Sequence, residues 1–239
     1  MILAAGPLLA APKDDVTAAA TALGNAANYS WQTLEDWGTN AQWQPGPMGG
    51  KTGKDGYTVV TMSMMDNTSE FVRKGTNLAV HTTDNGWQTM AEASHVYTGL
   101  RSPGMAVSLA LDLQLPAVEA TNLVVWASDW KVEGDKITCT LTEDGAKWIL
   151  GDREPPGGWK PIPPGVGGSI LQISASNAKG TLTFWVTDGK LTKYKTHVTG
   201  SLSSFGAHRM DSDLTKTVTI KDVGTTKVVV PDDAKKKMQ

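Results

Sequence analysis

Side chains that could carry out catalysis or hold a metal are scattered along this sequence. The four histidines, His81, His95, His197 and His208, show neither the i, i+4 nor the His-x-His spacing of a metal site. Cys139 is the only cysteine, and in a strand-like stretch a cysteine is usually a small buried hydrophobe. Nucleophile-elbow, phosphate-loop and dinucleotide-binding glycine motifs are all absent. We therefore predict a protein that is not an enzyme and uses no metal and no cofactor.

Soft and aromatic side chains are the unusual feature. Nine Trp exceed the seven Phe and Tyr combined, and methionines cluster in the middle of the chain. Methionine fills irregular apolar space, so a Met-rich zone suits a greasy ligand of variable shape. The alternative is that each of these side chains simply packs a core. A surface for carbohydrate is a further reading, built from Trp37, Trp43 or Trp159, which lie in polar or Gly/Pro-rich stretches.

The composition excludes several classes of protein. Of 239 residues, 40% are hydrophobic, and 22 basic residues against 24 acidic ones give a net charge of −2. A nucleic-acid-binding domain usually carries a basic excess, which is missing here. No apolar run reaches the roughly 18 residues that a membrane-spanning helix needs. We therefore expect no nucleic-acid partner and no membrane span, and a lone cysteine cannot form an intramolecular disulfide.

Residues 1–11 are apolar, rich in small side chains, and end abruptly at Pro12 and Lys13. This pattern resembles a secretory signal peptide that lacks its positively charged start, as a truncated signal would. A packed or disordered N-terminal arm is the alternative. We predict that residues 12–239 form a single domain of a periplasmic or secreted protein, and we expect a monomer.

The sequence predicts helices and short strands in a definite order along the chain. A helix is expected from Asp14, followed by a loop over 44–56, apolar helices over 105–115 and 117–126, and a small helix over 143–150 after Thr142. Strands are expected over 29–34, 57–64, 68–74, 77–82, 136–141, 181–186, 191–199, 214–221 and 227–230. Residues 151–168 are expected to form a long Pro/Gly loop, and the tail 232–237 to be solvated.

A family resemblance rests on the last sixty residues. The segment 180–186 (GTLTFWV), the tight turn and returning strand 188–194 (DGKLTKY) and the ending 222–231 (DVGTTKVVVP) resemble the half-barrel carriers of the bacterial envelope. These are the periplasmic LolA-type lipoprotein carriers and the LppX/LprG lipid-binding proteins. The resemblance implies an α+β fold, in which a strongly curved antiparallel sheet has helices packed on its concave face and binds acyl chains there.

This fold leads to a prediction about the binding site. We expect an apolar cavity between the sheet and the helices of 105–126, lined in part by Met62, Met64, Met105, Leu109 and Trp126. The function expected is a non-enzymatic carrier of a lipid or an acylated ligand. The alternative is an envelope protein-interaction or stress-sensor module on the same fold, in which the protein's own side chains fill the cavity.

Overall fold

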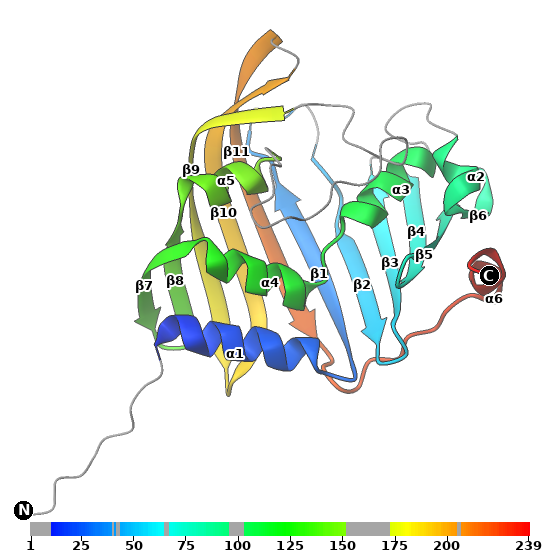
Figure 1. Ribbon diagram of the computed structural model, residues 1–239, viewed down its shortest axis with the longest axis horizontal. Helices are drawn as coiled ribbons and strands as arrows, with labels where there is room; N and C mark the ends of the chain where they lie inside the picture. The colour runs from blue at the N-terminus through cyan, green and yellow to red at the C-terminus, as the bar shows by residue number, and fades with distance from the viewer. Residues whose placement is uncertain are drawn as a thin grey trace, which may run out of the picture.

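The computed structural model of the protein describes residues 11–39, 41, 44–64, 67–95, 103–151, 173–204 and 207–239. In this part of the chain one antiparallel sheet of eleven strands runs in the order β6-β5-β4-β3-β2-β1-β11-β10-β9-β8-β7 (Figure 1). The sheet is open, because β6 and β7 are its two edges. Its strands are β1 (Asn28–Asp36), β2 (Met48–Gly53), β3 (Tyr57–Met64), β4 (Asn67–Lys74), β5 (Asn77–Thr82), β6 (Gly86–Thr89), β7 (Ala127–Glu133), β8 (Lys136–Leu141), β9 (Ile173–Thr187), β10 (Lys190–Ser204) and β11 (Ala207–Lys221).

Two meanders make up the sheet, and they meet at β1 and β11. Strands β1 to β6 follow one another on one side, and β7 to β11 follow one another on the other. The junction pairs the first strand with the last, from Ser30 opposite Lys221 to Asp36 opposite Thr215. On β2, next to this junction, Gly50 leaves room for the Trp31 ring: a Cβ atom at Gly50 would lie 2.1 Å from Cζ2 of Trp31.

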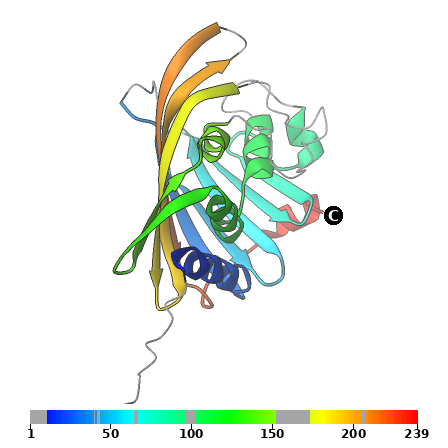
Figure 2. The same cartoon turned by 60° about the vertical axis from the view of Figure 1, so that its left-hand side comes forward.

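In the described part of the chain, helices α1 to α5 lie on the concave face of the sheet, which curves around them (Figure 2). Helices α1, α4 and α5 lie over the β7–β11 side, and α2 and α3 lie over the β4–β6 side. The core between these helices and the sheet is apolar, with Phe71, Leu123, Leu182 and Phe184 among its buried side chains. The helices are α1 (Pro12–Gly24), α2 (Met90–Ser94), α3 (Pro103–Asp112), α4 (Pro116–Val125) and α5 (Glu143–Ile149). The structure therefore confirms the predicted α+β half-barrel with helices on its concave face.

Local sequence signals explain several of these elements. Pro12 occupies the start of α1, where its missing N–H costs nothing, and Asp14 and Asp15 follow in the first turn. The Thr142 hydroxyl caps α5 by accepting a hydrogen bond from the backbone N–H of Gly145. Asp188 and Gly189 both have positive φ angles, as expected for the two central residues of a type I′ hairpin turn.

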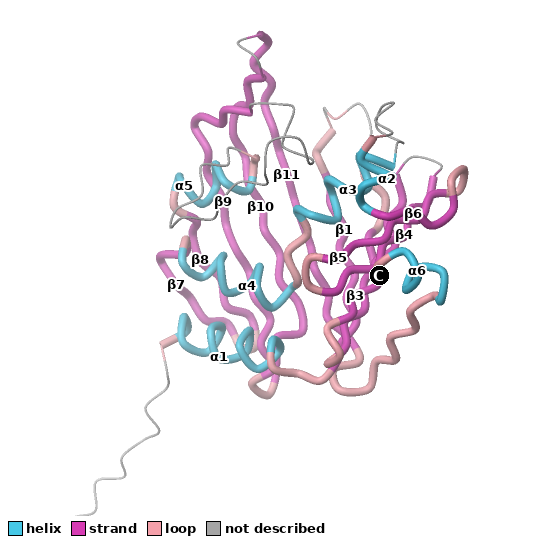
Figure 3. Tube along the Cα trace, turned by 45° about the vertical axis from the view of Figure 1, so that its right-hand side comes forward, coloured by secondary structure: helices cyan, strands magenta, loops and turns pink. Residues whose placement is uncertain are grey.

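A sixth helix, α6 (Asp232–Lys237), covers part of the opposite, convex face (Figure 3). Its Ala234 is fully buried in a small second core with Val72 and Ala79, whose neighbours Phe71 and Val80 belong to the main core on the other face. Strand β4 is therefore buried on both faces, as its adjacent apolar residues Phe71 and Val72 indicate. As predicted for a solvated tail, the charged side chains of 232–237 are mostly exposed, but the segment is a helix, and Ala234 among these charges packs against the sheet.

Other expectations also need correction. The predicted loop over 44–56 contains β2, where Gly50 pairs with Trp31 of β1 and leaves room for its ring. The predicted strand over 227–230 is irregular chain, although Val230 packs on the second core. Strands β6 and β7 and helix α2 were not predicted. Most of the predicted loop over 151–168 lies outside the described residues.

Candidate functional site

Helices α3 and α4 define the candidate site because they carry apolar side chains that are not buried. The buried side of α4 presents Ala117, Ala120, Leu123 and Val124 to the core. Its exposed positions are not correspondingly polar, since Val118 is 51% exposed and Val125 is 71% exposed. Seven residues apart on a helix, these two valines lie on nearly the same side. Leu109 on α3 is a further exposed apolar side chain of this concave side.

Glu119 is the only charged residue of α4, and it holds the helix to the sheet. Its Oε2 accepts a hydrogen bond of 2.6 Å from the Tyr194 hydroxyl on β10, and its Oε1 lies 2.6 Å from Nζ of Lys216 on β11. The side chains of Glu119 and Lys216 are only 12% and 20% exposed. A charge-assisted network of this kind stabilises the helix position, and breaking it would leave a poorly hydrated charge.

Burial changes the acidity of the phenol in this network. Tyr194 is fully buried, and desolvation raises its pKa well above the usual value, with the negative charge of Glu119 and the hydrogen bond to it acting in the same direction. The phenol therefore remains a neutral donor to Glu119 over the physiological pH range.

Lys216 also belongs to a row of side chains on the concave floor of the sheet. In the strand register it is opposite Thr196 on β10 and opposite Glu35 on β1. Side chains that are opposite one another on neighbouring strands share a face and lie close together. Thr196 is buried, and its hydroxyl has no hydrogen-bond partner among the described residues.

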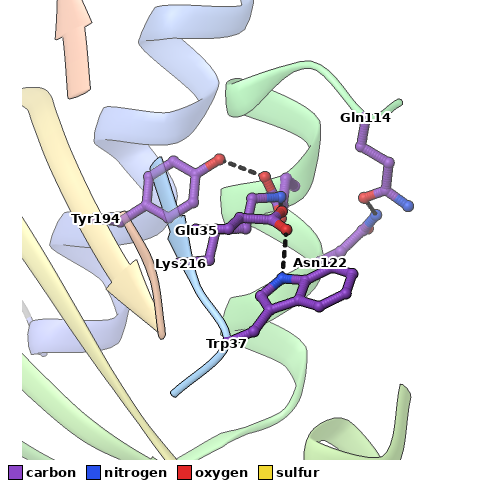
Figure 4. A network of polar contacts seen from close by, with 7 residues as sticks. Glu35, Trp37, Gln114, Asn122, Tyr194 and Lys216 are labelled. Atoms are coloured by element: carbon purple, nitrogen blue, oxygen red, sulfur yellow. Dashed lines mark hydrogen bonds and ion pairs between the residues drawn. The ribbon is translucent and has the colours of Figure 1, made fainter. Parts of the chain in front are cut away.

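Trp37 lies at the edge of this row. Its indole N–H donates a hydrogen bond of 3.0 Å to Oε2 of Glu35, and the ring remains exposed (Figure 4). Nearby in the same view, the Asn122 amide of α4 donates to Oε1 of Gln114 at 3.1 Å. Polar groups from β1, β10, β11, α4 and the α3–α4 connection therefore meet at one place on an otherwise apolar concave face.

Arg73 anchors the other helix. From the concave face of β4, one of its guanidinium nitrogens, Nη1, donates to the backbone oxygens of Ala110 and Leu113 at 3.3 and 3.2 Å. These oxygens lie at the end of α3, where carbonyl groups lack helical partners and favour a positive charge. Desolvation lowers the pKa of Arg73, but a guanidinium remains charged at ordinary pH.

The five residues predicted to line a cavity occupy different parts of the concave side. Met62 is buried in the main core on β3, Leu109 is exposed on α3, and Trp126 is half-buried after the end of α4. Met64 ends β3, and Met105 is in α3. Trp126 lies beside α5, because a Cβ atom added at Gly145 would lie 2.5 Å from the Cβ atom of Trp126. The α4 helix thus separates Trp126 from Leu109 and Met62, and the lining of a cavity by all five remains a prediction.

A pocket of about 690 Å³ lies elsewhere, at an irregularity in β9 where Asn177 has a positive φ. It is lined by residues of β8, β9, β10 and the start of α5, including Lys179 and His197. His197 Nε2 lies 2.8 Å from Oδ1 of Asp213 on the convex face. None of the five predicted residues lines this pocket.

The chemistry of the described side chains is sparse. Cys139 is buried, and desolvation raises the pKa of its thiol to about 12, which makes it a poor nucleophile. Within the described ranges, no three His, Cys, Asp or Glu side chains gather as a metal ion would require. Across the same residues, the helices are too short or too polar to cross a membrane.

Sequence reasoning missed Glu119, Tyr194, Lys216 and Glu35. One signal was present, because Glu119 is a lone acid in the apolar segment 116–125. A charge in such a segment usually has a partner, but strands β1, β10 and β11 become neighbours only in the folded sheet.

No protein-family model matches the chain, and no curated protein matches its sequence. Among solved structures, the lipoprotein LppX from Mycobacterium tuberculosis is similar at 12% identity and a TM-score of 0.48, with 92% of this chain and 98% of that chain covered.

Two further solved structures are similar to this chain. LprF from Mycobacterium bovis is 13% identical, with a TM-score of 0.48 and coverage of 92% of this chain and 96% of that chain. A LolA superfamily protein from Nitrosomonas europaea is 10% identical, with a TM-score of 0.31 and coverage of 94% and 97%. The similar solved structures thus include LppX and a LolA superfamily protein, the types of protein that the last sixty residues of the sequence resemble.

Proposed function

We propose that this protein is a non-enzymatic carrier that binds a lipid or an acylated ligand on the concave side of its sheet. The observation that carries the proposal is the exposed apolar surface of helices α3 and α4, formed by Leu109, Val118 and Val125. A helix packed by one face normally has a polar outer face. Here three exposed outer positions are aliphatic, which suits an acyl chain laid against them.

The energetics of such binding are favourable. Each CH₂ group that leaves water contributes about 0.8 kcal/mol, so a chain of ordinary length supplies enough free energy for micromolar binding even if much of it stays partly wet. The polar network of Glu119, Tyr194 and Lys216 would keep α4 in place beneath the ligand. Met62, Met64, Met105, Leu109 and Trp126 remain the proposed lining of a cavity on this side.

We further propose that the protein works in the periplasm or outside the cell. The apolar segment 1–11 ends where α1 begins at Pro12, as expected for a leader removed before folding. Intact-mass measurement of the protein exported by its host tests this, because the mature chain should begin near Pro12. A product that retains Met1 would contradict it.

The binding experiment uses the uncharged fluorescent probe N-phenyl-1-naphthylamine, displaced by unlabelled acyl compounds. We expect dissociation constants in the micromolar range or tighter, or about −8 kcal/mol. Leu109→Arg and Val118→Arg should abolish or greatly weaken binding, because the acyl chain would have to lie against a charge. Native mass spectrometry of protein purified from an envelope fraction should also detect a bound lipid.

Val229→Arg is the matched control, because Val229 is 78% exposed on irregular chain away from the concave helices. It should bind like the parent protein. If the parent protein binds neither the probe nor any acyl compound, the carrier proposal fails and the protein-interaction module is favoured. Saccharide binding that is lost in Trp37→Ala would instead favour the carbohydrate-binding reading.

A further inference from the structure

Among the described residues, two carboxylates of the concave floor, Glu35 and Glu119, lie near the ammonium group of Lys216. Glu35 and Glu119 both approach Lys216, one through the β1–β11 register and the other through an ion pair of 2.6 Å. Arg73, which also lies on the concave face, is occupied by the carbonyl groups of α3. The cluster of Glu35, Glu119 and Lys216 thus has a net charge of −1, in surroundings that are only partly hydrated.

The two carboxylates have different roles. Both oxygens of Glu119 are occupied, by Tyr194 and by Lys216. On Glu35, Oε2 accepts from the Trp37 indole, whereas Oε1 accepts no hydrogen bond from any described residue. Glu119 is therefore the structural anchor of α4, and Glu35 is the acceptor with capacity for another donor.

Two side chains next to this cluster, Trp37 and Thr196, would also contact a ligand bound there. Trp37 holds the Glu35 carboxylate in one orientation, and its exposed ring offers an apolar surface beside it. The buried Thr196 hydroxyl, on the other side of Lys216 in the same row, lacks a partner within the described part of the chain. Buried hydroxyl groups in native proteins are nearly always satisfied by protein or ordered water, so a water molecule or a ligand group is expected beside Thr196.

We propose that this row is a head-group site, and that Glu35 accepts a hydrogen bond from a hydroxyl or ammonium head of the bound amphiphile. This inference rests on the proposed carrier function and specifies its ligand class. The acyl chain then extends from Trp37 along the exposed aliphatic side chains of α3 and α4. An anionic head, such as a carboxylate, meets the net negative charge of the cluster and binds more weakly.

The test compares three amphiphiles of one chain length, dodecylamine, dodecanol and laurate, as competitors of N-phenyl-1-naphthylamine. The amine and the alcohol should bind about tenfold more tightly than laurate, in keeping with the strength of a hydrogen bond to a charged acceptor. Glu35→Gln should remove most of this difference. Glu35→Lys should reverse it and favour laurate.

Glu133→Gln provides the matched control, because Glu133 is an exposed carboxylate on the edge strand β7. It should leave the preference among the three heads unaltered. Equal binding of the three amphiphiles, unchanged by either substitution at Glu35, would overturn the head-group site and leave the carrier function standing. If none of the amphiphiles and not even the probe binds, the carrier function itself is wrong, and the head-group site falls with it.

Discussion

The Tyr194 hydroxyl donates a hydrogen bond of 2.6 Å to Oε2 of Glu119, across 75 positions of sequence. This contact joins the centre of the sheet to a helix whose outer side is exposed and apolar. A helix of that kind needs an anchor that does not depend on apolar burial alone, and the ion pair between Glu119 and Lys216 reinforces it.

Tyr194→Phe should therefore lower the free energy of unfolding by about 1.5–3 kcal/mol, the usual cost of losing a hydrogen bond to a charged group. Urea unfolding followed by tryptophan fluorescence measures this. Tyr57→Phe is the control, at a half-buried tyrosine outside the Glu119 network, and should change stability by no more than about 0.5 kcal/mol. Equal effects of the two substitutions would show that the Glu119 contact contributes nothing.

Alkaline pH should destabilise the protein through its buried tyrosines. Burial raises the pKa of Tyr29 to about 12 and that of Tyr194 well above its usual value. The folded protein therefore retains protons that the unfolded chain loses above about pH 10, so stability is full below that pH and falls as pH rises beyond it. Urea midpoints measured from neutral to alkaline pH should fall less steeply for Tyr194→Phe. Parallel curves for the two proteins would contradict the assignment.

Gly50→Ala tests the packing at the junction of the two meanders. An added Cβ would lie 2.1 Å from Cζ2 of Trp31, so the ring or the strand must move. Overpacking of this kind costs about 1–3 kcal/mol, and thermal unfolding should show it. Gly49→Ala is the matched control on the same strand, because its added Cβ would lie at an ordinary 3.8 Å from the Trp31 backbone oxygen. A similar cost at both positions would point to strand propensity instead of the Trp31 contact.

Cys139 should be nearly inert in the folded protein. Its side chain is buried and its thiol pKa is raised to about 12, so very little thiolate exists at about pH 8. Reaction with Ellman's reagent should be slow in buffer and rapid in guanidinium chloride. Since the chain has one cysteine, the signal comes from this site alone. Rapid stoichiometric labelling of the native protein would show that this part of the core opens easily.

Features encoded by neighbouring residues could be predicted. The turn at Asp188 and Gly189, the cap of α5 at Thr142 and the start of α1 near Asp14 follow from backbone preferences and from hydrogen bonds within a few residues. The half-barrel itself was inferred from a family resemblance, carried by the segments 180–186, 188–194 and 222–231 and by the order of the other elements.

Interactions between distant segments were decided only by the tertiary structure. Nothing local to 232–237 indicates that Ala234 faces a second core, and nothing local to Glu35 indicates that it lies opposite Lys216. The sequence by itself determined most of the helices and strands, the apolar character of α3 and α4 and the lack of catalytic motifs. The closing of β1 onto β11 decided which polar groups meet beneath α4, because that pairing depends on the burial of the whole sheet face rather than on any short stretch of chain.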